Sequence, residues 1–237
     1  MKYSIIVPVY KEAKNISRLI AEVNTVLKKN KIKYELLFVD DDSRDDSLKI
    51  FNKNKNKNTK FYVRNQKPRD LSRSVVYGFE KSNNDNLIVM DGDLQHNPKD
   101  LLKLIKIYKN SKCDLVIGSR RLENYKIANL NPLRFFFSKI LNMFFNLLFN
   151  KKINDPMSGF FLLKKKIYKK CKKNLTLLGY KILIDIVLSS KSSLNIKEVF
   201  INFKIRDKGF SKMRPKILFQ LLLFLLIKFI KHEKKNK

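Results

Sequence analysis

The chain alternates short apolar runs with longer segments of helical hydrophobic spacing. Predicted strands lie at residues 3–7, 34–39, 60–64, 87–90 and 115–117. Predicted helices lie between them, at residues 11–30, 45–51, 71–81 and 98–108. The first strand is expected to stop at Pro8, because proline has no N–H to donate to a strand ladder. Strands that alternate with helices indicate an α/β fold with a mostly parallel sheet flanked by helices.

Polar residues follow four of these predicted strands. The four groups are Pro8-Val9-Tyr10, Asp40-Asp41-Asp42-Ser43, Asp91-Gly92-Asp93 and Ser119-Arg120. In a doubly wound sheet, ligands bind outside the carboxyl ends of the strands. We therefore expect acids and a base from separate units to meet at one edge of the sheet.

The turn Asp91-Gly92-Asp93 is the candidate metal site. A divalent cation such as Mg²⁺ takes oxygen ligands and keeps positions for water or substrate phosphates. Alone, two acids one residue apart are more often a solvated loop. Their place beside the other strand ends favours a cation that bridges the protein and a diphosphate.

The character of the chain changes after residue 130. Residues 133–149 are rich in phenylalanine, and their polar side chains, Arg134, Ser138, Asn142 and Asn146, recur every four positions. On a helix this spacing gives a slowly drifting polar stripe. Two interpretations of this segment remain: a helix of the protein core, or a helix partly inserted into a membrane interface. Residues 155–161 form a turn that feeds a strand, 175–189 are mainly helical, and 196–205 alternate as a strand does.

Residues 217–230 are strongly apolar and are interrupted by Lys228. As a helix they would be about 20 Å long, which is shorter than the roughly 30 Å hydrocarbon core of a bilayer. We predict an amphipathic helix on the membrane interface, whose basic residues meet anionic headgroups. A helix packed on the domain is the alternative. The expected organisation is one domain over residues 1–212 and a membrane-associating segment over 213–237.

Composition narrows the possible partners. The 237 residues carry a formal net charge of +31, which favours anionic partners such as a nucleotide or an anionic membrane. No motif with a base-reading mechanism is present, so we do not predict binding to nucleic acid. Cys113 and Cys171 form no metal or disulfide pattern, and Cys113 is expected in the core. This use of cysteine fits a reducing cytosol. No signal peptide is visible at the start of the chain.

Several motifs together resemble one enzyme family. Residues 4–12 (SIIVPVYKE), 39–43 (VDDDS) and 91–93 (DGD) resemble the opening, nucleotide-binding turn and metal motif of inverting GT-A glycosyltransferases of family 2. Residues 93–96 (DLQH) and 155–161 (DPMSGFF), with Arg206, Gly209, Ser211 and Lys212, resemble the dolichol- or polyprenol-phosphate mannose synthases within that family. The resemblance covers about residues 3–212, and its most specific part is 155–161. The middle residue of the metal motif is often alanine in that subfamily and is Gly92 here, which removes no ligand.

The resemblance implies a role for individual residues. The nucleotide-sugar donor would contact Pro8, Tyr10, Glu12, Val39, Asp41, Asp91, Gly92, Asp93, Gln95, Arg206 and Lys212. Asp91, Asp93 and Gln95 would hold Mg²⁺ or Mn²⁺, while Arg120, Arg134 and Ser138 would bind the acceptor phosphate. The catalytic residues would be Asp93, Arg120 and Arg206.

The implied reaction is mannosyl transfer from GDP-mannose to polyprenyl phosphate, with inversion, on the cytoplasmic face of a membrane. The acceptor is a phosphate monoester whose second pKa is about 6, so it is largely ionised near pH 7 and needs no general base. His96 is accordingly expected to be a loop residue near the metal. A UDP-sugar transferase and a non-catalytic membrane-surface module are the alternatives.

Overall fold

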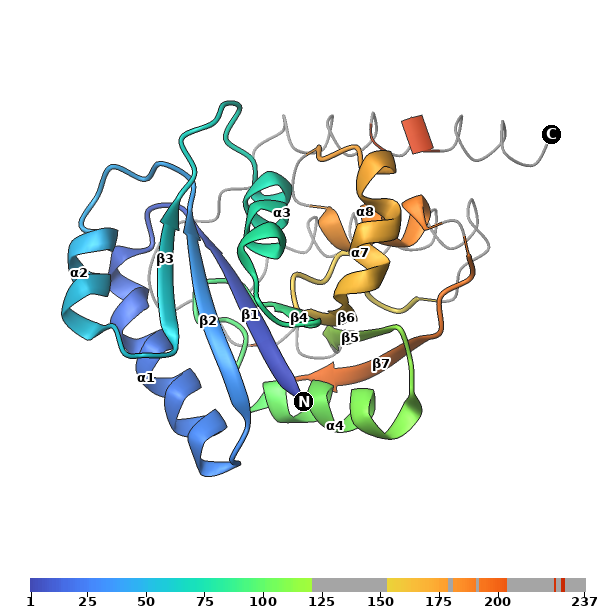
Figure 1. The fold of residues 1–237 in the computed structure, drawn as a ribbon, viewed down its shortest axis with the longest axis horizontal. Coiled ribbons are helices and arrows are strands. Elements are labelled where there is room, and N and C mark those ends of the chain that lie inside the picture. Colours follow the sequence, from blue (N-terminus) through green and yellow to red (C-terminus); the bar gives the residue numbers. More distant parts are fainter. Residues whose placement is uncertain (121–152, 179–180, 191, 204–223, 225–226, 229–237) are drawn as a thin grey trace, which may run out of the picture.

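One seven-stranded sheet organises the molecule (Figure 1). In this computed structural model, the described residues are 1–120, 153–178, 181–190, 192–203, 224, 227 and 228. The strand order is β3-β2-β1-β4-β6-β5-β7. The strands are β1 (Lys2–Val9), β2 (Lys33–Asp40), β3 (Thr59–Val63), β4 (Asn86–Val89), β5 (Leu115–Arg120), β6 (Phe161–Lys164) and β7 (Ile196–Ile201). Only β6 runs antiparallel to its neighbours, so the predicted mostly parallel sheet is confirmed.

Helices cover both faces of the sheet (Figure 1). They are α1 (Ala13–Lys29), α2 (Ser47–Asn54), α3 (Leu71–Lys81), α4 (Asp100–Ser111), α7 (Lys165–Cys171), the 3₁₀ turn η1 (Lys172–Asn174) and α8 (Ile182–Ser189). Successive residues of a strand point to opposite faces. In β1, Ile5 and Val7 therefore pack with α1, α2 and α4, while Ile6 packs with α3, α7 and α8. The sheet thus has a separate hydrophobic core on each side.

β1 runs through Pro8, where the sequence predicted its end. The carbonyl of Ile6 accepts from Met90 next to β4, and that of Val9 accepts from Asp41 next to β2. Pro8 therefore faces the β4 side, where β4 has already ended at Val89 opposite Ile6. Because no partner strand lies there, the missing N–H of Pro8 costs no ladder bond.

The second half of the chain departs further from its predicted elements. The helix expected over 175–189 is confined to α8, and α7 was not predicted. The Asp185 carboxylate in α8 accepts the backbone N–H groups of Thr176 and Leu177 at 2.7 and 2.8 Å, which keeps these residues out of a helix. The lysine-rich α7 buries only Ile167, Tyr168 and Cys171, too few for a clear pattern.

The predicted interface helix over residues 133–149 and most of the apolar segment 217–230 lie outside the described residues. Across the part of the chain that is described, no helix is long and apolar enough to cross a membrane. Phe224 and Lys228 are described, and both are buried. Phe224 belongs to the core that contains α7 and α8. At these two positions the chain therefore packs on the domain, as the alternative proposed.

Lys228 was expected among lipid headgroups but lies in a buried ion pair. Its Nζ is 2.5 Å from Asp185 Oδ1 and donates to Ser189 Oγ at 2.6 Å and to the Asn174 carbonyl at 3.1 Å. The side chains of Lys228 and Asp185 are 4% and 2% exposed. This contact fixes Lys228 to α8.

Lys228→Met should therefore destabilise the protein, because it leaves the Asp185 carboxylate buried without its cation. The expected loss is about 3 kcal/mol in the free energy of unfolding, measured by urea denaturation. Lys170→Met, at an exposed lysine of α7, is the matched control and should change stability by less than about 0.5 kcal/mol. Equal midpoints for the two variants would show that Lys228 does not hold its segment on α8.

A second buried carboxylate ties together the amino-terminal ends of the strands. Glu35 in β2 accepts from Ser4 Oγ and from the backbone N–H of Asn83, both at 2.6 Å, and pairs with Lys60. Burial by itself raises the pKa of the Glu35 carboxyl, but these partners outweigh burial and lower the pKa below its usual value. The ionised form of Glu35 therefore stabilises the fold.

We expect Glu35→Gln to cost about 1 to 2 kcal/mol of stability at pH 7. Because the folded-state pKa is lowered, the stabilising effect of Glu35 is present above the unfolded-state pKa of about 4.3 and is lost as pH falls through the folded value. Urea unfolding between pH 3 and 7 should show the two proteins converging in acid. Glu22→Gln, in the exposed pair with Arg18, should show little pH-dependent difference from wild type. A constant difference for Glu35→Gln would contradict the assignment.

Candidate active site

The carboxyl ends of β1, β2 and β4 lie next to one another in the sheet. Val9 pairs with Asp40, and the N–H of Asp41 donates to the Val9 carbonyl at 3.0 Å. A Cβ added to Gly92, just after β4, would lie 2.8 Å from Val9 Cγ1. The acidic turn therefore packs closely on the end of β1. The strand order reverses direction between β1 and β4, which is where ligands bind in doubly wound sheets.

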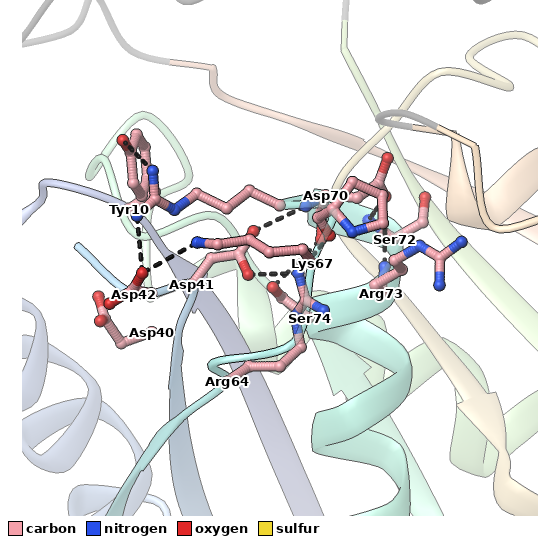
Figure 2. A network of polar contacts seen from close by, with 12 residues as sticks. Tyr10, Asp40, Asp41, Asp42, Arg64, Lys67, Asp70, Ser72, Arg73 and Ser74 are labelled. Atoms are coloured by element: carbon pink, nitrogen blue, oxygen red, sulfur yellow. Dashed lines mark hydrogen bonds and ion pairs between the residues drawn. The ribbon is translucent and has the colours of Figure 1, made fainter.

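Asp41 is the centre of a buried polar network (Figure 2). Its Oδ1 is 2.5 Å from Arg64 Nη2, and its Oδ2 accepts the N–H of Asp70 at 2.7 Å. Arg64 also donates to the Pro68 carbonyl at 2.9 Å, and Asp70 caps α3. The loop after β3 is thereby fixed against the end of β2. Arg64 Nε is buried without a partner in the described residues.

Asp42 lies at the outer side of this network. It is 3.0 Å from Lys67, 2.7 Å from Arg69 and 3.2 Å from Arg44, and these cations hold the pKa of its carboxyl well below the usual range. The Arg69 guanidinium also lies over the Tyr10 ring, 5.3 Å from its centroid. Asp42 has a φ of 58°, in the left-handed region that few residues other than glycine adopt.

The remaining predicted donor residues differ in how they reach the site. Pro8 and Val39 pair with each other at the ends of β1 and β2. The Val39 side chain is fully buried on the α3 side, so only its main chain faces the strand ends. Glu12 lies at the start of α1, where its Oε2 accepts from Asn15 at 2.7 Å.

The acidic turn presents its two carboxylates differently. The Asp91 side chain is 31% exposed, whereas Asp93 is buried. Asp93 Oδ1 accepts the N–H of Gln95 at 3.1 Å. Leu94 lies between Asp93 and Gln95 and has a φ of 63°. Its side chain is buried in the core that contains α1 and α4. Burial of the Leu94 side chain therefore offsets the cost of its left-handed backbone conformation in this turn.

These residues fit a divalent cation by their chemistry. Asp91, Asp93 and Gln95 offer the hard oxygen atoms that Mg²⁺ and Mn²⁺ prefer. Among the described residues, no three His, Cys, Asp or Glu side chains form a metal-binding group. A cation held by this turn would need further ligands, as a substrate diphosphate or water can supply.

Arg120, the last residue of β5, is clamped by the segment 155–161. Asp155 accepts Arg120 Nε at 2.6 Å and Nη2 at 2.7 Å, a bidentate pair. The guanidinium lies over the Phe203 ring, 5.4 Å from its centroid. The Arg120 side chain remains 18% exposed. The orientation of the Arg120 guanidinium at the sheet edge is therefore fixed.

The same segment, 155–161, contacts the acidic turn. Ser158 Oγ donates to the Gly118 carbonyl at 2.7 Å, and the N–H of Gly118 donates to Phe160 at 2.8 Å. A Cβ added at Gly159 would lie 2.7 Å from Asp91 Oδ2. One short segment therefore touches both the predicted metal ligand Asp91 and the end of β5.

The sequence analysis left several residues of this site unassigned. No role was predicted for Arg64, Arg69 or Asp70. Arg64 directly follows β3, so it could have been predicted at the ligand-binding edge, where the carboxyl ends of the strands lie. Residues 155–161 resemble the mannose synthases, but no role was predicted for any residue within them. The predicted site residues Arg134, Ser138, Arg206 and Lys212 lie outside the described residues.

Comparisons with a family model and with individual proteins identify the same family of enzymes. Residues 4–172 match the family described as Glycosyl transferase family 2. The chain is 36% identical over 224 residues to a dolichol-phosphate mannosyltransferase of Pyrococcus furiosus, covering 94% of this chain and 62% of that protein. The chain thus spans less than two thirds of that relative's length. It is 32% identical to the dolichol-phosphate mannosyltransferase of Saccharomyces cerevisiae, covering 94% of this chain and 85% of the relative.

Solved structures share the fold at lower sequence identity. Glucosyl-3-phosphoglycerate synthase from Mycobacterium tuberculosis, in complex with Mn²⁺, UDP-glucose and phosphoglyceric acid, superposes with a TM-score of 0.74 at 15% identity. The match covers 96% of this chain and 79% of that one. It supports the GT-A-like arrangement of sheet and helices.

Proposed function

The chain belongs to glycosyl transferase family 2, and we propose that it transfers a mannosyl group from GDP-mannose to a polyprenyl phosphate. The products are a polyprenyl-phosphate mannose and GDP. One observation carries the proposal: residues 155–161 contact both the acidic turn and Arg120. These contacts support a site in which Asp91 would face the diphosphate and Arg120 would face the acceptor phosphate, in a chain related to dolichol-phosphate mannosyltransferases.

The donor would lie across the ends of β1, β2 and β4. Asp41, held by Arg64 and the Asp70 N–H, would face the nucleoside, with Tyr10 at its outer side. Asp91, Asp93 and Gln95 would hold Mg²⁺ or Mn²⁺ against the diphosphate. A cation in this position would offset the negative charge that develops on the departing GDP.

The acceptor phosphate supplies its own nucleophile. With a second pKa of about 6, it is largely a dianion near pH 7 and attacks without a general base. His96 is accordingly not assigned as a general base. Its Nδ1 already accepts the Asp91 N–H at 3.2 Å, and its side chain is only 1% exposed. Arg120 would receive the acceptor phosphate, and we assign Arg134 and Ser138 to the same task.

Catalysis then consists of positioning and charge stabilisation. Two anions must approach each other, and the Arg120 guanidinium offsets part of their repulsion. We assign Arg206 and Lys212 to the closing of the site over the donor. Attack in line with the departing GDP inverts the sugar, so an α-linked donor gives a β-linked lipid product.

We further propose that the protein works on the cytoplasmic face of a membrane. The acceptor would be a lipid, and residues 133–149 are apolar enough to lie at a membrane interface. Phe224 and Lys228 of the second apolar segment pack on the domain, so we do not assign their side chains to the membrane. The net charge of +31 favours an anionic surface.

A direct test is transfer of labelled sugar into lipid extracted with organic solvent. Purified protein in detergent receives polyprenyl phosphate, Mg²⁺ or Mn²⁺, and either GDP-mannose or UDP-glucose. We expect labelled lipid from GDP-mannose alone and none after addition of a chelator. Product from UDP-glucose instead would overturn the donor. No product from either, with an active relative as positive control, would favour the non-catalytic alternative.

Asp93→Ala should lower the rate of this transfer by about 10²- to 10³-fold, the usual loss when one electrostatic stabiliser is removed. The matched control is Asp85→Ala, an exposed acid beside the opposite end of β4, which should keep the wild-type rate. Circular dichroism would establish that both variants fold. A wild-type rate for Asp93→Ala, still abolished by chelator, would move the metal site elsewhere.

A further inference from the structure

Gly159 lies directly against the carboxylate of Asp91. A Cβ at position 159 would be 2.7 Å from Asp91 Oδ2, 2.8 Å from Oδ1 and 3.0 Å from Cγ. A carbon atom does not approach other atoms this closely without displacing them. The present position of the carboxylate therefore requires glycine at residue 159.

His96 holds the main chain of the same acid. Its Nδ1 accepts the Asp91 N–H at 3.2 Å. The buried imidazole stacks on Phe160, with the two ring centroids 5.0 Å apart. Phe160 follows Gly159 in the chain, so residues 155–161 fix Asp91 both directly and through His96.

The segment itself is held rigidly. Ser158 Oγ donates to the Gly118 carbonyl and accepts the Phe160 N–H at 3.1 Å. The Gly118 N–H in turn donates to the Phe160 carbonyl. A Cβ on Gly118 would lie 2.7 Å from the Phe160 ring. The backbone at Gly159 therefore cannot retreat easily from Asp91.

We propose that Gly159 and His96 are positioning residues that aim the Asp91 carboxylate at the divalent cation. Neither touches the substrates. Gly159 leaves the space in which the carboxylate lies, and His96 fixes the peptide from which it extends. This inference rests on the proposed function, which assigns the cation to Asp91. It explains why a glycine and an aromatic residue follow each other at positions 159 and 160.

The test is the affinity of the purified protein for Mn²⁺ in the presence of GDP, measured by the electron paramagnetic resonance signal of free Mn²⁺. Gly159→Ala should fold, because the atoms that must move are the flexible end of the Asp91 side chain. We expect its Mn²⁺ affinity to fall about 10- to 100-fold, as for other residues that support a metal ligand. His96→Leu, which removes the acceptor of the Asp91 N–H, should weaken Mn²⁺ binding in the same direction.

A double-mutant cycle separates positioning from general damage. If Gly159 acts through the Asp91 carboxylate, Gly159→Ala should change Mn²⁺ affinity much less in an Asp91→Asn background than in wild type. GDP binding in chelator should be the same in wild type and Gly159→Ala. Both results would support the proposal.

Failure of this inference differs from failure of the proposed function. If wild type binds Mn²⁺ with GDP and Gly159→Ala and His96→Leu bind it equally well, the positioning role is wrong and the function stands. Equal losses from Gly159→Ala in both backgrounds would also overturn the role. If wild type binds Mn²⁺ with neither GDP nor UDP, the proposed function fails, and this inference fails with it.

Discussion

The antiparallel direction of β6, among the strands that the structure describes, is the constraint on which the site depends. β6 lies between β4 and β5 and runs against both. A strand inserted in this direction begins at the edge where its neighbours end. The residues that lead into β6 must therefore cross the carboxyl ends of β4 and β5. Residues 155–160 occupy this position, so their contacts with Asp91 and Arg120 follow from the topology of the sheet.

Buried ion pairs attach loops and segments that do not take part in the sheet. In the described part of the chain, Asp41 with Arg64 fixes the loop after β3, and Asp185 with Lys228 fixes a residue near the end of the chain to α8. Desolvation makes such pairs weak sources of net stability, while loss of one partner is costly. We infer that each pair acts mainly by holding its loop or segment in one position.

The sequence predicted the sheet and most of the strand-end residues because those depend on short-range patterns. Asp41, Asp91 and Arg120 each follow or end a run of strand-forming residues, and parallel strands bring their ends to one edge. Arg64 also ends a strand, but a lone arginine carries no pattern that separates it from the many other cations. The buried position of Lys228 depends on Asp185, far away in the chain. Such contacts require the tertiary fold, and so does the fit of Gly159 to Asp91.

The charges at the site imply an order for binding under the proposed function. Asp91 and Asp93 would repel the diphosphate of the donor, and Asp155 already compensates the charge of Arg120. The strand-end acids therefore oppose both anionic substrates as long as no cation is bound. The positive charge of the whole chain raises the local concentration of anions but does not remove this local repulsion. A divalent cation bound with the donor would neutralise the charges of Asp91 and Asp93, so we expect the site to accept the metal complex of the donor. Because residues 155–161 contact both Asp91 and Arg120, a donor bound in this way would lie near the arginine that we assign to the acceptor.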